Sequence, residues 1–271
     1  MASTKREKEL ARLRAERQAA RRAAAVARRK QRRAVIASVL AVALIAAGAV
    51  ALAATLSDDP KTDPAAAPSA QPSPSPSAGP PGTCTYTASQ GPAARKVKLP
   101  PTTGVETKQP FTATITTNRG VIAFDLLTAQ APCTTNSLRS LAHFTYFDNT
   151  PCHRLVTAGI FVLQCGDPSG LGSGGPGYQF ADENLEGATY PRGTVAMANA
   201  GAGTNGSQFF LVYKDSQLPP QYTPFGKITK GLEVLDAVAA GGSLPGQDGK
   251  PNDGKPKLGV TIKTLRTAAK R

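Results

Sequence analysis

The sequence is poor in the residues on which many catalytic and metal sites depend. It has only two histidines, His143 and His153, and their spacing matches no zinc-ligand pattern, so we expect no metal. A Ser-His-Asp hydrolase would have to use His153, but the chain has no G-x-S-x-G motif, and the neighbouring Arg154 would disfavour an imidazolium. We interpret His143 as a helix-end residue and His153 as a core or strand residue.

The chain also lacks a recognisable pair of catalytic carboxylates and a nucleotide-binding loop. Asp167, Asp182 and Glu183 lie in loops rich in Gly and Pro, where the simplest interpretation is that solvent surrounds them. The pattern G-x-G-x-x-G occurs at residues 170–175, before another loop, and at residues 201–206, before a strand-like run. A dinucleotide-binding loop requires a helix after it. We therefore interpret both patterns as turns and expect no cofactor.

Most of the net positive charge is confined to residues 1–33. They contain thirteen Lys or Arg and three Glu, so +10 of the chain's net charge of +14 lies here, in a spacing that suits a basic helical tail. The tail has no aromatic side chain to stack on bases, and anionic lipid attracts clustered Lys and Arg. We expect lipid contact and no nucleic-acid binding. The competing hypothesis, a nucleic-acid binder at the membrane surface, requires salt-sensitive binding through this tail.

Residues 34–56 run for 23 positions without a charge, which is long enough for one transmembrane helix. A cluster of Lys and Arg directly precedes this run, and positive flanks stay cytoplasmic. We therefore expect a single-pass protein of the cell membrane, with a cytoplasmic N-terminus and an extracytoplasmic C-terminal domain. The alternative is a secreted protein released by signal cleavage, because residues 51–53 form a small-x-small site.

Residues 57–108 separate the apolar run from a globular domain at residues 109–271. The first part of this segment is dominated by Pro, Ser and Ala, which cannot bury a core, and is expected to be a disordered, polyproline-like linker. The second part gains Cys84 and Tyr86. We expect it to be an N-terminal extension that packs partly on the domain.

The domain combines short strand-like runs with two helical patterns. Residues 111–117 and 121–127 alternate around a turn and predict an antiparallel hairpin. Helices are predicted over residues 132–144, with two threonines near the start as candidate caps, and over residues 231–240. Further strands are predicted at residues 152–156, 160–165, 195–198, 208–213, 225–228 and 258–265. About eight short strands indicate a mainly β fold closed into an antiparallel barrel, because closure removes exposed edges.

The four cysteines are Cys84, Cys133, Cys152 and Cys165, an even number without a C-x-x-C motif. In an exported domain we expect disulfides, for which three pairings are possible. If Cys152 and Cys165 face each other across one hairpin they can pair. That pairing leaves Cys84 to tie the N-terminal extension down through Cys133.

Five short motifs follow one another in an order that is typical of one family. They are CHRL at residues 152–155, IFVLQCGD at 160–167, MANAG at 197–201, NGSQFF at 205–210 and FGK at 225–227. This order resembles the cyclophilin-type peptidyl-prolyl cis-trans isomerases over about residues 109–265. The resemblance implies an eight-stranded antiparallel barrel capped by two helices, and an enzyme that rotates Xaa-Pro bonds without a cofactor.

The resemblance also implies a role for each site residue. Arg154 would donate a hydrogen bond to the prolyl nitrogen as amide conjugation is lost, Gln164 would orient Arg154, and Phe161 would complete the catalytic group. The implied substrate-binding residues are Val162, Ala198, Asn199, Ala200, Gln208, Phe210, Leu218 and Tyr222. In this scheme Phe161, Val162, Phe210 and Leu218 form the apolar pocket for the proline ring.

The sequence departs from the family at three pocket positions. Val162, Gln217 and Tyr222 stand where many cyclophilins have Met, Trp and His, and the chain contains no Trp at all. Cyclosporin binding is therefore possible but expected to be weakened. The expected partners are proline-containing polypeptides, in particular exported chains whose folding the domain would assist as a chaperone. The alternative is a non-catalytic module that grips proline-containing segments at the cell envelope and would not need Arg154.

Overall fold

A computed structural model describes residues 80–246 and 249–270 of the chain. The predicted basic tail at residues 1–33 and the predicted transmembrane helix at residues 34–56 lie outside the described residues, as does most of the predicted linker. Within the part that is described, no helix is both long and apolar enough to span a membrane. Membrane anchoring therefore stays a prediction.

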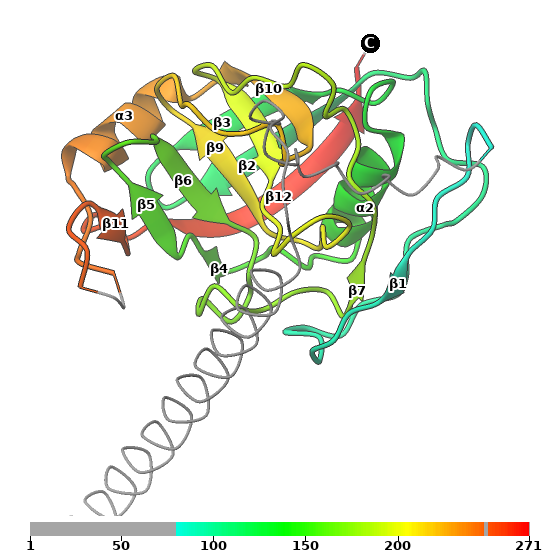
Figure 1. Cartoon of the computed structure of the whole chain (residues 1–271), viewed down its shortest axis with the longest axis horizontal. Coiled ribbons are helices and arrows are strands. Elements are labelled where there is room, and N and C mark those ends of the chain that lie inside the picture. The colour runs from blue at the N-terminus through cyan, green and yellow to red at the C-terminus, as the bar shows by residue number, and fades with distance from the viewer. Residues whose placement is uncertain (1–79, 247–248, 271) are drawn as a thin grey trace, which may run out of the picture. The chain divides into compact units, whose positions relative to one another are not determined.

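The described residues form twelve strands and two helices (Figure 1). In chain order they are β1 (Thr87–Ala88), β2 (Phe111–Thr117), β3 (Val121–Leu126), α2 (Pro132–His143), β4 (Thr150–Pro151), β5 (Arg154–Val156), β6 (Val162–Cys165), β7 (Tyr178–Gln179), β8 (Thr194–Met197), β9 (Phe209–Val212), β10 (Pro224–Lys230), α3 (Leu232–Ala240), β11 (Asp253–Gly254) and β12 (Thr261–Ala269). The predicted hairpin and both helices are confirmed. Strands β1, β4, β7 and β11 were not predicted, because two residues show no alternation.

Ten of the strands form one curled antiparallel sheet in the order β11-β5-β6-β9-β8-β10-β3-β2-β12-β4 (Figure 1). This order confirms the mainly β fold. The sequence predicted a closed barrel of eight strands, whereas the observed strand pairing is open, with β11 and β4 at its two ends. The end strand β4 and strand β5, which is next to the other end, belong to one stretch of chain. The Cys152 N–H donates to Val260 O beside β12 (2.9 Å), and the His153 N–H donates to Gln164 O in β6 (3.1 Å).

Alternation along the strands separates two apolar clusters. In β9, Phe209 and Leu211 belong to the main core inside the curled sheet, whereas Phe210 and Val212 belong to a second cluster on the other face. Strand β6 repeats this pattern, with Leu163 in the core and Val162 in the second cluster. A period of two places successive side chains on opposite faces. The second cluster is therefore a platform on the outer face of β6, β8 and β9.

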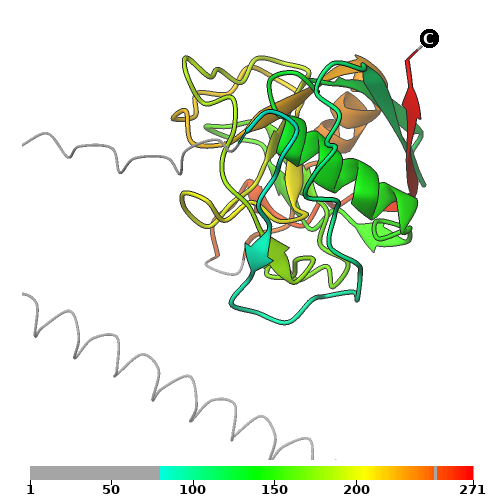
Figure 2. The same cartoon turned by 90° about the vertical axis from the view of Figure 1, so that its right-hand side faces the viewer.

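The two helices lie at opposite ends of the curled sheet, as Figures 1 and 2 show from perpendicular directions. Helix α2 turns Leu138, Leu141 and Ala142 inward, and α3 turns Leu235 and Val238 inward. These residues recur at three- and four-residue intervals and so share one face of their helix. Each helix thereby closes off part of the main core.

The first turn of α2 is capped by a side chain from a distant loop. Glu183 accepts hydrogen bonds from the N–H groups of Cys133 (3.0 Å) and Thr134 (2.8 Å), and the N-cap residue, Ala131, provides no side-chain cap. The predicted caps, Thr134 and Thr135, and the predicted solvation of Glu183 were therefore wrong. Burial raises the pKa of the Glu183 carboxyl despite these donors. The first N–H groups of a helix need an acceptor, whether it comes from near or far along the chain.

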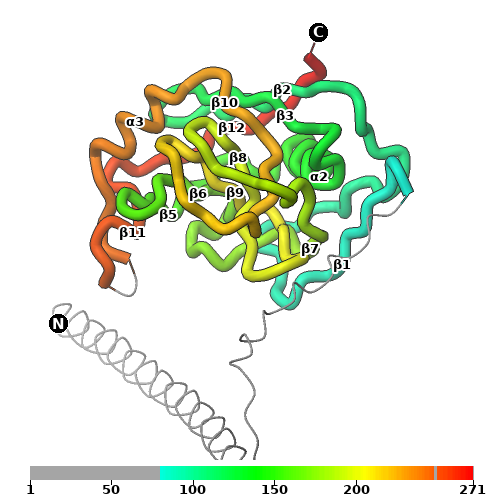
Figure 3. Tube along the Cα trace, turned by 45° about the horizontal axis from the view of Figure 1, so that its top comes forward, coloured from blue at the N-terminus to red at the C-terminus, as the bar shows by residue number. Residues whose placement is uncertain are grey.

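The N-terminal extension is part of the folded unit. Strand β1 pairs with β7 beside α2 (Figure 3), and Cys84, Tyr86 and Val105 are buried in the main core. The structure joins Cys84 to Cys133, so the extension is tied covalently to the first turn of α2. The Tyr86 hydroxyl also donates to Cys133 O (2.8 Å). Packing of this segment is thus more extensive than the partial contact that the sequence predicted.

Candidate active site

The strand register places the two polar residues of the predicted catalytic group side by side. Arg154 in β5 lies opposite Gln164 in β6, and Gln164 lies opposite Phe210 in β9. All three belong to the outer face of the sheet, next to the second apolar cluster. Residues that the sequence separates by up to 56 positions therefore meet on one surface.

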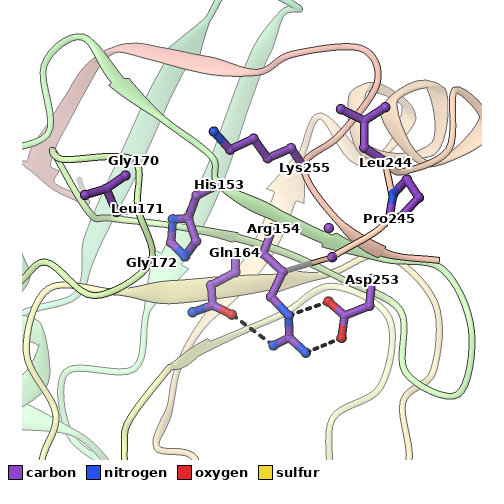
Figure 4. A pocket seen from close by; sticks show the side chains of 12 residues that line it. His153, Arg154, Gln164, Gly170, Leu171, Gly172, Leu244, Pro245, Asp253 and Lys255 are labelled. Atoms are coloured by element: carbon purple, nitrogen blue, oxygen red, sulfur yellow. Dashed lines mark hydrogen bonds and ion pairs between the residues drawn. The ribbon is translucent and has the colours of Figure 1, made fainter. Parts of the chain in front are cut away.

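Hydrogen bonds hold the Arg154 guanidinium on two sides (Figure 4). Nη1 donates to Gln164 Oε1 (3.2 Å), while Nε and Nη2 donate to the two carboxylate oxygens of Asp253 (2.6 and 2.8 Å). Two parallel bonds from a planar guanidinium to a carboxylate fix both position and orientation. Sequence reasoning missed Asp253, because an aspartate in the turn P-N-D-G carries no sign of a partner 99 residues away.

A second line of hydrogen bonds supports Gln164 from behind. Its Nε2 donates to Gln208 Oε1 (2.9 Å), and Gln208 Nε2 donates in turn to the carbonyls of Gly172 (3.0 Å) and Gly174 (2.9 Å). The chain of contacts fixes which end of each amide is oxygen and which is nitrogen. Gln208 therefore acts on Arg154 through Gln164.

The loop that carries these carbonyls is organised around Asp167. This carboxylate is fully buried and accepts hydrogen bonds from the N–H groups of Ser169 (2.8 Å), Gly172 (2.7 Å) and Gly174 (3.0 Å). Burial alone would raise the pKa of Asp167, but these hydrogen bonds outweigh it and the pKa lies below its usual value. The prediction that Asp167 is solvated was therefore wrong. The Gly-rich pattern at residues 170–175 is, as expected, a turn.

A small cavity, here called the proline cavity, opens beside Arg154. It has a volume of about 130 Å³. Its lining residues are Arg154, Ile160, Val162, Gln164, Ala198, Asn199, Phe210, Leu218 and Tyr222. The ring of Tyr222 meets that of Phe210 edge to face, with centroids 5.6 Å apart. The cavity thus combines one charged donor, Arg154, with apolar and aromatic side chains that suit a small ring.

Three of the predicted site residues do not line this cavity: Phe161, Ala200 and Gln208, the last of which contacts Gln164 from behind. Phe161 packs on the main core against Tyr213 (ring centroids 6.0 Å apart), because Val162 and Gln164 occupy the outer face and alternation turns Phe161 inward. Ile160 takes the place by the cavity that the resemblance assigned to Phe161. Ala200 lies in an exposed loop, where its N–H donates to Thr204 Oγ1 (2.8 Å).

A disulfide braces the strands that carry the polar pair. The structure joins Cys152 to Cys165, so the chain two residues before Arg154 is linked to the residue after Gln164. This is the pairing that the hairpin argument favoured. His153, between Cys152 and Arg154 in the sequence, is buried. Neither of its ring nitrogens makes a hydrogen bond within the described residues. Burial lowers the pKa of the imidazole. The buried position of His153 agrees with the sequence interpretation.

A curled antiparallel sheet with two helices, and an arginine–glutamine pair beside a small cavity, defines the cyclophilin class of domain. Residues 112–267 match the family described as cyclophilin type peptidyl-prolyl cis-trans isomerase/CLD. The chain belongs to this family.

Individual relatives agree with this assignment. A Mycobacterium leprae protein named "Probable peptidyl-prolyl cis-trans isomerase B" is 49% identical over 199 residues, which cover 68% of this chain and 66% of that protein. Peptidyl-prolyl cis-trans isomerase B of Streptomyces anulatus is 42% identical, over 50% of this chain and 87% of its own length. The chain thus spans slightly less than two thirds of the mycobacterial relative.

Solved structures give the same result. A Cryptosporidium parvum cyclophilin type peptidyl-prolyl cis-trans isomerase, crystallised in the presence of the dipeptide Ala-Pro, is 33% identical and superimposes with a TM-score of 0.52. The match covers 59% of this chain and 99% of that chain. A second crystal structure of the same protein gives 32% identity and a TM-score of 0.51.

Proposed function

We propose that this chain is a peptidyl-prolyl cis-trans isomerase that acts on proline-containing polypeptides. The observation that carries the proposal is the Arg154 guanidinium, held by Gln164 and Asp253 at the rim of the proline cavity. Family membership supports it, as does the neighbour crystallised with Ala-Pro.

The chemistry of the reaction explains why such a site suffices. Rotation about an Xaa-Pro bond breaks no covalent bond, and its barrier of about 18–20 kcal/mol arises from amide resonance. Without a catalyst the two forms exchange over tens of seconds or longer. A catalyst has only to bind the twisted amide more tightly than either planar form. No nucleophile is required.

Each site residue has a place in that scheme. As the amide twists, the lone pair of the prolyl nitrogen is no longer delocalised and becomes a hydrogen-bond acceptor. Arg154 donates to it, so this bond is strongest in the transition state, where it lowers the barrier. In this proposal Val162, Phe210 and Leu218 hold the proline ring, and Asn199 holds the substrate backbone. Gln164 accepts a hydrogen bond from the Arg154 guanidinium and so keeps it oriented.

The proposal is tested by Arg154→Ala in the purified full chain, with exchange of an Ala-Pro peptide followed by NMR. Loss of the donor should lower kcat/KM by about tenfold or more. Arg266→Ala is the matched control, because Arg266 in β12 also forms a paired contact with an aspartate, Asp148, but does not line the cavity. This control should keep wild-type activity.

Two outcomes would contradict the proposal. Full activity in Arg154→Ala would contradict the mechanism in which Arg154 donates to the prolyl nitrogen. A wild-type chain that binds the peptide without accelerating exchange would be the non-catalytic binding module instead.

We also propose that the chain is anchored in the cell membrane by residues 34–56, with the isomerase domain outside the cytoplasm, where it assists the folding of exported proteins. The charge-free run, the basic residues before it and two disulfides support this, since disulfides persist in oxidising compartments. Protease added to intact spheroplasts should degrade the domain and spare an N-terminal tag. A soluble product without residues 1–53 would instead indicate signal cleavage.

We further infer that the domain of residues 109–271 is a barrel closed through residues 150–156. Hydrogen bonds from this stretch to Val260 on one side and Gln164 on the other support closure.

We also propose that cyclosporin binds weakly, since Gln217 is exposed and no Trp is present.

A further inference from the structure

A second and larger cavity shares Arg154 and Gln164 with the proline cavity (Figure 4). Its volume is about 620 Å³, and we call it the flanking cavity. Besides the shared pair it is lined by His153, by residues 170–172 of the loop around Asp167, and by residues 244–246 and 253–255. None of these three segments lines the proline cavity.

The shared residues place the two cavities next to each other, on either side of Arg154 and Gln164. A proline seated in the proline cavity has chain on both sides of it, and each residue of an extended chain advances by about 3.3–3.6 Å. A chain that passes the Arg154 guanidinium therefore enters the flanking cavity within about two residues. The occupant that fits is the substrate itself.

The walls of the flanking cavity favour an apolar side chain. Leu171 is 70% exposed and Leu244 is 47% exposed, and Figure 4 shows them at opposite sides of the cavity. Single exposed leucines are common, but two that line one cavity form an apolar surface that a ligand can cover.

The charges in the flanking cavity select against a basic side chain. Arg154 and Asp253 compensate each other as an ion pair, whereas the ammonium group of Lys255 at the rim adds a positive charge. A Lys or Arg side chain entering the cavity would be repelled by Lys255. An uncharged side chain meets no such barrier.

We propose that the flanking cavity is a specificity subsite that binds an aliphatic side chain of the substrate, within two residues of the proline, through Leu171 and Leu244. The inference rests on the proposed isomerase function. It names the class of polypeptide preferred at that site: proline segments flanked by aliphatic and not by basic residues.

The test uses the purified full chain and three peptides with an Ala-Pro core, whose flanking positions are all Leu, all Ser or all Lys. The wild-type chain should convert the Leu peptide with a kcat/KM about five- to tenfold above that of the Ser peptide, because an apolar side chain is removed from water. The Lys peptide should be the poorest substrate. In the double variant Leu171→Ser with Leu244→Ser, the ratio of Leu to Ser peptide should fall to about one.

Leu99→Ser is the matched control, because Leu99 is also exposed (58%) but lies outside both cavities. It should keep the wild-type ratio. Equal rates for the Leu and Ser peptides, or an unchanged ratio in the double variant, would overturn the subsite and leave the isomerase function standing. Binding of the Leu peptide without isomerisation, lost in the double variant, would overturn the function and keep the subsite.

Discussion

At the scale of single residues, the site depends on how Arg154 is held rather than on Arg154 alone. A guanidinium on a flexible stem loses conformational freedom when it must point at one atom, and Gln164 and Asp253 restrict it before substrate arrives. The ion pair is partly exposed, with 40% of the arginine side chain and 31% of the aspartate side chain accessible. Exposed pairs contribute about 0–1 kcal/mol to folding, so the main effect of this pair is on orientation.

Asp253→Asn should therefore act on turnover more than on stability. We expect kcat to fall about tenfold while KM stays within about twofold, because the substrate still binds but the donor is misplaced. Asp253→Glu, which keeps the carboxylate, should restore part of the rate. Steady-state isomerisation and thermal unfolding measure the two effects. A loss of stability with an unchanged kcat would show that the pair is only structural.

At the scale of elements, the site residues on β5 and β6 are supported from behind by the loop that follows β6. The Asp167 carboxylate accepts hydrogen bonds from three backbone N–H groups of this loop. Carbonyls of the same loop in turn accept hydrogen bonds from Gln208. A side chain at Gly174 would collide with the Asp167 carboxylate, so the loop can close around it only with glycine there. The strands position the catalytic pair, and the loop keeps it in one arrangement.

Asp167→Asn should destabilise the fold by about 2–3 kcal/mol, because an amide cannot accept all of these hydrogen bonds. The folded pKa of Asp167 lies below its unfolded value, so its contribution is present above pH of about 4 and is lost as the pH falls through the folded pKa. Urea unfolding between pH 2.5 and pH 7 measures both effects. The free energy of unfolding of the Asp167→Asn variant should therefore fall less than that of the wild-type chain as the pH is lowered.

Asp236→Asn is the control for this experiment, because Asp236 is exposed and pairs with Arg192 at the surface. Its effect on the free energy of unfolding should be much smaller. Equal effects of the two substitutions would contradict the supporting role of Asp167.

At the scale of the whole molecule, a disulfide that closes a long loop joins the N-terminal extension to the domain. The Cys84–Cys133 disulfide spans 49 residues of sequence and joins the extension to α2, while Glu183 binds the same turn from the loop after β7. Three segments far apart in the chain thus meet at the start of α2. The domain that carries the site begins structurally before the family match at residue 112.

Replacing both Cys84 and Cys133 by Ser should lower the free energy of unfolding by about 4 kcal/mol in the chain-entropy model, since the loop they close is long. Denaturant unfolding of the oxidised proteins measures the change. The isomerisation rate below the transition should stay near wild type, because neither cysteine lies at the proline cavity. A fall in activity without a fall in stability would contradict this view.

The sequence by itself determined the family, the hairpin, both helices and most of the residues around the proline cavity. The hairpin and the helices follow from local periodicity, whereas the family and the cavity residues follow from the resemblance that the short motifs carry. Only the tertiary structure decided that Asp253 pairs with Arg154, that Glu183 caps α2 and that Asp167 is buried, because each contact joins distant segments. It also decided that Ile160, and not Phe161, faces the cavity. The five-residue turn between β5 and β6 sets which residues alternate outward, and no local pattern shows that phase.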